Sequence, residues 1–402
     1  MPGQEGLARP SGGETVPLRV LPTSLSPSGV PAGRAVARER LPLLALGLLS
    51  LLAGLWGGLL LLGLSVPTLR SSTAEDHGPL MALGFLGTVI ALERAVALRR
   101  PWGYAAPAAA GAGGLVLLAG LPALLGWSLL CLGSVVFLLI YAVALRIQPA
   151  LHLVVMAAGG LCWYLATVLW LGGWPVPRLV PWLAGFLVLT ILGERLELAR
   201  VALLTKASVR AFSTGAAALG AGLLLTAVSG RATEFGVRLA GAGLLALAAW
   251  GARYDIARRT VKIAGITRFM AGCLLAGYVW LATAGITWLL AGGLGDIGIH
   301  QATYDTALHA VFLGFVMSMI FGHAPVIVPA VLRVRLPFRR WFYGHLALLH
   351  AALLLRLVGG DAAGNRPAWQ VGGAGTEVAI LLFLAVSITA VLRARTPRVR
   401  AA

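Results

Sequence analysis

The sequence predicts an all-α integral membrane protein with twelve transmembrane helices in three pseudo-repeated four-helix units. Apolar residues make up 59% of the chain and charged residues 11%. Apolar stretches of about 20 residues, the length that crosses a bilayer, recur along it. A spacing also repeats: Gly-Phe is followed, nine residues after the glycine, by an ionisable residue in GFLGTVIALER, GFLVLTILGER and GFVMSMIFGHA, which begin at Gly84, Gly185 and Gly314.

The apolar stretches divide the chain into one membrane domain, residues 41–395, between two tails. Residues 1–40 are rich in Pro, Gly, Ser and Arg, which predicts a disordered cytoplasmic tail. Residues 396–402 form the second tail, and no cleavable signal peptide is expected. The predicted helices are 42–66, 79–98, 104–122, 127–146, 150–171, 179–200, 211–229, 236–253, 267–291, 304–331, 341–359 and 371–393.

The basic residues predict the orientation of these helices. Of the 32 Lys and Arg residues, 26 fall in the tails or in the loops after even-numbered helices. By the positive-inside rule, both termini are cytoplasmic and the protein lies in the inner membrane. The net charge of +18 is explained by this asymmetry. The expected partner is therefore the lipid bilayer, and no nucleic-acid partner is expected.

The motifs of soluble enzymes are absent. The sequence contains no GxSxG, P-loop, HExxH or dinucleotide fingerprint. The three cysteines, Cys131, Cys162 and Cys273, lie inside predicted helices without a CxxC spacing, which indicates packing residues. Any catalysis is expected to use intramembrane histidine, glutamate or a cofactor.

The repeated spacing ends in Glu93, Glu194 and His323. The second, sixth and tenth helices run in the same direction, so these three residues lie at one membrane depth. Such a cluster would relay protons or bind a cation, because charge in hydrocarbon is costly and usually functional. The alternative is that Glu93-Arg94 and Glu194-Arg195 are helix-end ion pairs that reach the interface.

Further residues near the inner end belong to the same hypothesis. Pro325 and Pro329 follow His323 and are expected to interrupt the tenth helix, which is tolerated where the backbone lines a cavity. His345, near the start of the eleventh helix, is a further candidate metal ligand beside His323, Glu93 and Glu194. His350 lies five residues on and therefore faces another way.

Two histidines occupy the outer parts of the second and tenth helices. His77 begins the second helix, because Pro79 is tolerated only in a first turn. His309 lies five residues into the tenth helix. If the two helices face each other, the two imidazoles would clamp a haem iron. The alternative is an interfacial His77 and a hydrogen-bonded His309. At 100° per residue, His323 would share nearly the same helix face as His309.

These residues resemble the NnrS family of twelve-helix bacterial membrane proteins, which bind haem and copper and are linked to nitric oxide stress during denitrification. The similar segments are His77-x-x-x-Met81-x-x-Gly84-Phe85 and Ala307-Leu308-His309-Ala310, followed by Gly322-His323. The chain departs from the family's His-x-His-Glu-Met pattern, since Pro79 replaces the second histidine.

The chain also resembles, more broadly, subunit I of haem–copper oxidases and nitric oxide reductases. That resemblance implies a haem held by His77 and His309. The sixth and seventh helices contain no histidine, and Val311 stands where a His-x-His pair would end. A complete haem–copper oxidase, and oxygen reduction, are therefore not expected.

Three functions follow as hypotheses. The first is an NnrS-like haem-binding membrane protein of nitric oxide metabolism or protection, with copper as a further candidate cofactor and nitric oxide or an electron donor as partner. Any enzymatic activity would then be haem-dependent redox chemistry. The second is a proton-coupled transporter using Glu93, Glu194 and His323. The third is an assembly or scaffold protein without a cofactor.

Overall fold

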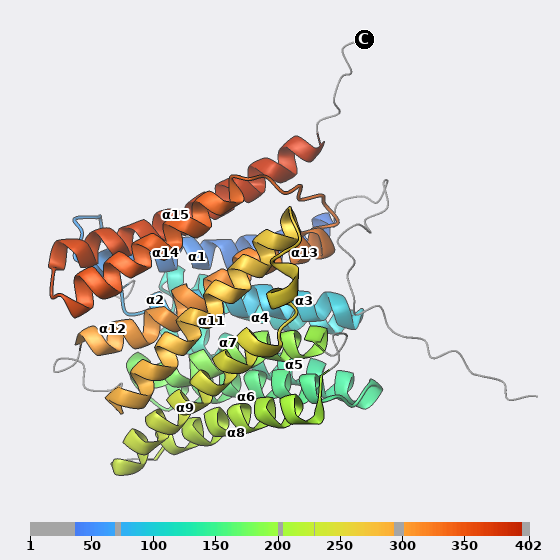
Figure 1. The fold of residues 1–402 in the computed structure, drawn as a ribbon. Coiled ribbons are helices and arrows are strands. Elements are labelled where there is room, and N and C mark those ends of the chain that lie inside the picture. Colours follow the sequence, from blue (N-terminus) through green and yellow to red (C-terminus); the bar gives the residue numbers. More distant parts are fainter. Residues whose placement is uncertain (1–36, 69–73, 200–203, 229, 293–300, 396–402) are drawn as a thin grey trace, which may run out of the picture.

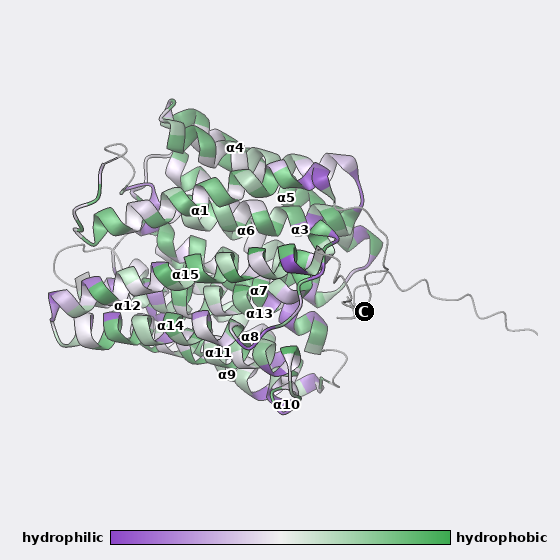
Figure 2. Cartoon of the chain, turned by 90° about the horizontal axis from the view of Figure 1, so that it is seen from above, coloured by the Kyte–Doolittle hydropathy of each residue, from purple (hydrophilic) through white to green (hydrophobic). Residues whose placement is uncertain are grey.

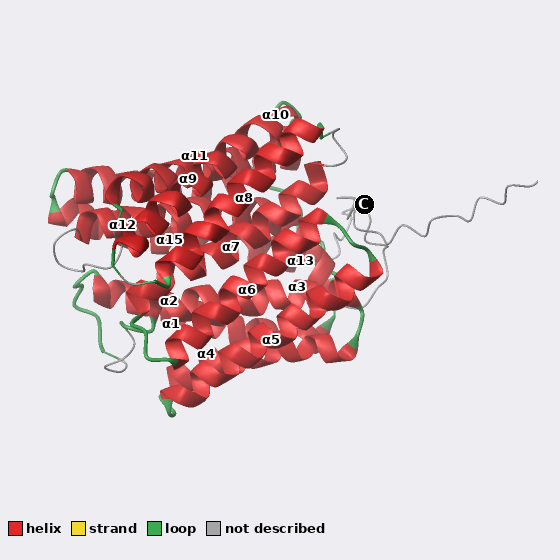
Figure 3. Ribbon diagram, turned by 90° about the horizontal axis from the view of Figure 1, so that it is seen from below, coloured by secondary structure: helices red, strands yellow, loops and turns green. Residues whose placement is uncertain are grey.

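The computed structural model describes residues 37–68, 74–199, 204–228, 230–292 and 301–395, which form a bundle of helices joined by short connections (Figures 1 and 3). No β-strand occurs among these described residues. The predicted tails lie outside them, except that Arg38–Arg40 form a short 3₁₀ turn, η1, before the first long helix.

The described chain alternates long α-helices with short irregular helical segments. A second 3₁₀ turn is η3 (Pro101–Tyr104), and the π-helical segments are η2 (Leu80–Gly87), η5 (Ala310–Met317) and η6 (Leu355–Ala362). The α-helices are α1 (Leu41–Leu61), α2 (His77–Pro79), α3 (Thr88–Leu98), α4 (Ala105–Ala119), α5 (Ala123–Ile147), α6 (Leu151–Leu171), α7 (Val176–Ala199), α8 (Lys206–Thr226), α9 (Arg231–Tyr254), α10 (Ala257–Thr260), α11 (Ile266–Ala291), α12 (Gln301–His309), α13 (Ser318–Leu332), α14 (Phe342–Leu354) and α15 (Arg366–Arg395).

Within the described ranges, twelve helical spans are long and apolar enough to cross a membrane, which confirms the predicted number. Figure 2 shows hydrophilic residues mostly at the two ends of the bundle and hydrophobic residues along its length. Large apolar side chains also face outward; Leu290 is 71% exposed and Val279 66%. A soluble bundle would bury such residues, so the surface is that of a multi-pass membrane protein.

Small residues allow the helices to approach closely. A Cβ atom placed on Gly241 of α9 would lie 2.5 Å from the Leu289 nitrogen of α11. Close backbone contact at glycine is typical of membrane helices, where dispersion forces and not water exclusion hold helices together. The three cysteines are free, and Cys162 and Cys273 are buried, as expected for packing residues.

The second and tenth membrane spans are composite helices. In the second, α2 leads into η2 and then α3; in the tenth, α12 leads into η5 and then α13. A π turn contains more residues than an α turn, so the rotation of 100° per residue does not hold across η5. The prediction that His309 and His323 share a helix face assumes an unbroken α-helix, and η5 lies between the two residues. The predicted break at Pro325 and Pro329 was wrong, because α13 continues through both to Leu332.

The second, sixth and tenth spans pack against one another. Near one end, α2 contacts α7, and α7 contacts η5; toward the other end, α3 contacts α13. Residues that the sequence spacing placed at equal depth are thereby brought into one interior.

Candidate functional site

A cavity of about 720 Å³ lies among α1, the first parts of the second, sixth and tenth spans, and α15. Both His77 and His309 line it. Most of its wall is apolar or aromatic, including Trp127 and Trp170, which stack with ring centroids 4.8 Å apart. An apolar cavity with a few polar groups, in the range of roughly 300–1,000 Å³, is typical of a small-molecule or cofactor site.

The two cavity histidines are held by the same kind of hydrogen bond, from Nδ1 to a main-chain carbonyl. Nδ1 of His77 lies 2.6 Å from the Gly54 carbonyl oxygen of α1, and Nδ1 of His309 lies 2.9 Å from the Asp305 carbonyl oxygen. A carbonyl only accepts, so Nδ1 carries the hydrogen in each ring and Nε2 keeps a lone pair. Metal-binding histidines in proteins are commonly fixed by such a bond. The arrangement therefore suits both rings to ligation through Nε2.

A charged cluster stands beside His309. The Asp305 carboxylate accepts hydrogen bonds from Arg356 Nε at 2.8 Å and Nη2 at 2.7 Å, and from Trp369 Nε1 at 3.2 Å. Nearby, the Thr306 hydroxyl donates to Asp361 at 2.9 Å. The π segment η6 carries both Arg356 and Asp361, and α12 carries Asp305 and Thr306, so two different spans hold the cluster together.

Two glycines of α1 make room for the cavity groups. A Cβ atom on Gly54 would meet the Met81 side chain at 2.7 Å. One on Gly58 would lie 2.5 Å from Glu377 Oε1 and 3.2 Å from His77 Cε1. His77 and Glu377 therefore pack over the same glycine, and a side chain at position 58 would occupy the space that they use.

At the other end of the bundle, Arg94 joins two of the repeated acidic residues. Its Nη2 lies 2.9 Å from Glu93 Oε1 and 2.6 Å from Glu194 Oε1. The side chains are only 15–21% exposed. The prediction that Glu93 and Glu194 lie together is confirmed. Of the alternative ion pairs, Glu93-Arg94 is confirmed, and Glu194-Arg195 was wrong, because Glu194 pairs with Arg94 and Arg195 pairs with Asp255.

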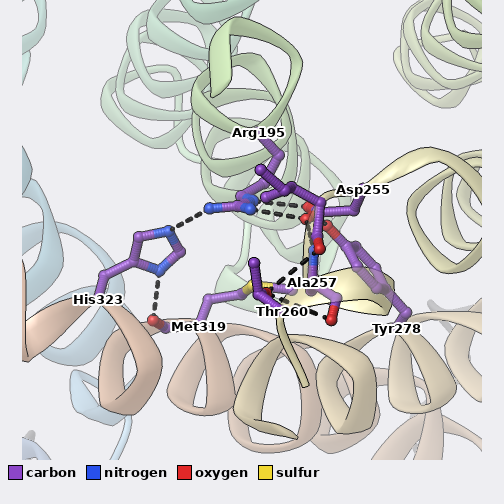
Figure 4. Close-up of polar contacts among 8 residues, drawn as sticks. Arg195, Asp255, Ala257, Thr260, Tyr278, Met319 and His323 are labelled. Atoms are coloured by element: carbon purple, nitrogen blue, oxygen red, sulfur yellow. Dashed lines mark hydrogen bonds and ion pairs between the residues drawn. The ribbon is translucent and has the colours of Figure 1, made fainter. Parts of the chain in front are cut away.

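The second arginine of the repeat takes part in a different buried network (Figure 4). Arg195 donates to both carboxylate oxygens of Asp255 at 2.7 Å, and Tyr278 Oη donates to Asp255 Oδ2 at 2.5 Å. The Ala257 amide also donates to Oδ1 at 2.8 Å. On the opposite side, Arg195 Nη1 lies 3.4 Å from His323 Nε2.

This network fixes the chemical state of two of its members. His323 donates from Nδ1 to the Met319 carbonyl at 2.6 Å, so Nε2 is the acceptor for Arg195 and is already used. Asp255 lies in the connection after α9, and its side chain is 0% exposed. Burial alone would raise the pKa of Asp255, but the hydrogen bonds and charge of Arg195, with Tyr278, hold that pKa below its usual range.

Replacing Tyr278 with phenylalanine is expected to lower the free energy of unfolding by about 1.5–3 kcal/mol, the range for hydrogen bonds to charged groups. The variant keeps the ring and removes one donor from a fully buried carboxylate. The check is equilibrium unfolding in detergent micelles, with Tyr254→Phe as the control, because Tyr254 is on the neighbouring helix and is not among the groups bonded to Asp255. Equal effects of the two substitutions would contradict the prediction.

The model of a domain of unknown function, DUF8744, matches residues 40–392, from the start of the first span to the end of the last. The chain belongs to this family. Comparison with curated proteins and with solved structures gave no match.

In this DUF8744 domain His345 and His350 have separate surroundings. His345 is fully buried among four aromatic rings, the nearest being Phe321 with a centroid 4.7 Å away. His350 Nδ1 accepts from Trp280 Nε1 at 2.9 Å, so the two histidines do face different partners. Among the residues described here, no three His, Cys, Asp or Glu side chains are grouped to hold a metal ion. The predicted set of His323, His345, Glu93 and Glu194 therefore gains no geometric support as a metal site.

Several DUF8744 residues at these two sites were missed by the sequence reasoning. Asp305, Arg356 and Glu377 line the cavity, and Asp255 completes the other network. A signal was present for the first three, since each is a charged residue inside a predicted apolar helix, and such residues are usually functional or paired. The repeated spacing identified Glu93, Glu194 and His323 instead.

Proposed function

We propose that this protein binds haem in the cavity, with His77 and His309 as the ligands of the iron, and that it acts in nitric oxide metabolism or protection. One observation carries the haem proposal: two histidines from different spans line one apolar cavity, and each is held through Nδ1 by a carbonyl. Histidines on helices whose Nδ1 is hydrogen-bonded in this way are well suited to bind iron through Nε2.

The cavity residues fit a haem in three further ways. The cavity volume of about 720 Å³ accommodates a large cofactor. Its aromatic and aliphatic wall matches an apolar macrocycle. Arg356 also lines the cavity and uses Nε and Nη2 for Asp305, which leaves Nη1 for the carboxylate groups that a haem carries.

Each part of the cavity wall would then have a defined role in holding haem. His77 and His309 would hold the group, Gly54 and Asp305 would fix their ring orientations, and the apolar wall would exclude water. When bound, haem supplies an iron that exchanges one electron. With two histidine ligands the expected role is electron transfer, and the link to nitric oxide rests on the NnrS resemblance alone.

We further infer that the bundle consists of three four-helix units inserted in the inner membrane with the Arg-rich end cytoplasmic. The segments η2 and η5 support the repeat, because Gly84 and Gly314 each stand at the fifth of eight π-helical residues. The corresponding part of α7 stays α-helical, with Pro181 inside the helix. The three copies have therefore diverged in backbone as well as in sequence.

The haem proposal predicts an absorption band. Protein purified in detergent, with haem supplied during expression or added afterwards, is expected to show a Soret band. Replacing His77 or His309 with alanine removes an iron ligand and is expected to abolish it. Absorption spectroscopy with a pyridine haemochrome assay measures the bound haem.

The matched control is His350→Ala, because His350 does not line the cavity and bonds to Trp280. This variant is expected to keep the band of the unsubstituted protein. A folded, haem-supplemented protein without any Soret band overturns the proposal, as does a band that survives in the His77→Ala/His309→Ala double variant.

A proton-coupled transporter is the second proposal. It is less well supported than haem binding, because the ionisable groups that it needs are already bonded to arginines. Arg94 donates hydrogen bonds to both Glu93 and Glu194, and His323 already accepts from Arg195. A threefold repeat also differs from the twofold repeats usual in transporters. If proton-driven uptake into proteoliposomes is found and is lost in Glu93→Gln and Glu194→Gln, the transporter replaces the haem protein.

A further inference from the structure

Asp305 contacts His309 through two different oxygens. Its carbonyl oxygen accepts the hydrogen of His309 Nδ1 at 2.9 Å, and its carboxylate Oδ1 lies 3.1 Å from the same nitrogen. The Asp305 side chain is 13% exposed and that of His309 12%, so water screens this contact poorly. The imidazole N–H is therefore directed at a main-chain oxygen with a negative charge beside it.

The Asp305 carboxylate is held in place from the other side. Arg356 donates two hydrogen bonds to it, Trp369 donates a third, and the Arg356 guanidinium lies over the Trp369 ring at 5.1 Å from the centroid. Two parallel bonds from a planar guanidinium fix both position and direction. Asp305 therefore cannot turn away from His309 without breaking three bonds.

The other cavity histidine lacks this arrangement. The bond described for His77 Nδ1 is to the neutral carbonyl of Gly54. Glu377 packs with His77 over Gly58, and the bond described for His77 Nδ1 is not to this carboxylate. Among the described residues the two candidate ligands thus differ, because His309 has a fixed carboxylate at its Nδ1 and His77 has a carbonyl there.

We infer that Asp305 is a positioning residue that makes His309 the stronger electron donor of the pair and lowers the reduction potential of the bound haem. This inference rests on the proposed haem function. A carboxylate beside Nδ1–H increases the basicity of Nε2. A more basic ligand stabilises the ferric iron relative to the ferrous iron.

The test is the reduction potential of the haem-loaded protein with Asp305→Asn. The change keeps the side-chain shape and the main-chain carbonyl and removes the charge. The Soret band is expected to remain, and the equilibrium constant for reduction to rise about tenfold, which is about 59 mV for one electron. Spectroelectrochemical titration measures it without any assay of activity.

The matched control is Asp361→Asn, which alters a carboxylate of the same cluster that contacts Thr306 and Asp305 and is not bonded to His309. Its effect on the potential is expected to be less than half as large. If Asp305→Asn does not fold, Asp305→Glu is the variant to test. It keeps the ion pair with Arg356, while its longer side chain displaces the carboxylate from His309 Nδ1. Asp305→Glu should also raise the reduction potential.

The possible failures are distinguishable. Absence of a Soret band from the folded, unsubstituted protein overturns the haem function itself. A normal band in every protein, with the Asp305 variants at the potential of the unsubstituted protein or of Asp361→Asn, overturns only the role of Asp305.

Discussion

Replacing Arg195 with methionine is expected to lower the free energy of unfolding by about 3–5 kcal/mol, the usual cost of removing one partner of a buried ion pair. Asp255 has no exposed side-chain surface, and Arg195 supplies two of the hydrogen bonds to its carboxylate. The variant leaves that charge buried with Tyr278 and the Ala257 amide as its remaining donors. Equilibrium unfolding in mixed detergent micelles measures the change.

Two further variants separate this effect from a general loss of charge. Arg253→Met removes an exposed arginine of the same region that lies over the Tyr254 ring, and it should cost less than about 1 kcal/mol. The double variant Arg195→Met/Asp255→Asn removes both charges and should recover most of the loss. A double variant as unstable as Arg195→Met would show that packing, and not the unpaired charge, causes the effect.

The Arg195–Asp255 ion pair also predicts how the free energy of unfolding depends on pH. The pKa of Asp255 is lowered in the folded protein, so the stability that it contributes is complete above the ordinary aspartate pKa of about 3.9. This contribution is lost as the pH falls through the lowered, folded-state pKa. The stability difference between the unsubstituted protein and Asp255→Asn should therefore be constant near neutral pH and shrink only in strong acid.

The number and positions of the spans were predictable because they depend on composition over about 20 residues. The π-helical segments were not, since GFLGTVIALER carries no residue that requires an i to i+5 turn. The predicted helix face of His309 and His323 depends on α-helical rotation, and η5 lies between them. The two prolines did not predict the end of a helix, because α13 accommodates Pro325 and Pro329 within a continuous helix.

The two sites were predictable to different degrees. Repetition identified Glu93 and Glu194, and the structure brings them to one arginine. It did not identify Asp255, whose place in the network depends on how the connection after α9 folds back on α7. Likewise, Arg356 lies 51 residues from Asp305, and only the packing of η6 against α12 brings them together.

Filling the space above Gly58 is expected to weaken haem binding about 10- to 100-fold while the protein remains folded. In Gly58→Leu the new side chain must displace Glu377 Oε1 and then the His77 ring, which lie 2.5 Å and 3.2 Å from a Cβ atom at this position. Disturbing the residues that support a metal ligand typically lowers metal affinity about 10- to 100-fold. Haem titration followed by the Soret band measures the affinity, and circular dichroism with thermal unfolding checks the fold.

Graded and matched variants make this result specific to the cavity. Gly58→Ala should retain most of the binding, because its first contact is the end of the flexible Glu377 side chain. Gly272→Leu, on α11, places the same side chain where nothing lies within 4 Å of a Cβ atom, and it should bind haem normally. If Gly58→Leu is folded and binds haem as tightly as Gly272→Leu, the ligand does not lie where His77 packs over α1, and the cavity assignment must be abandoned.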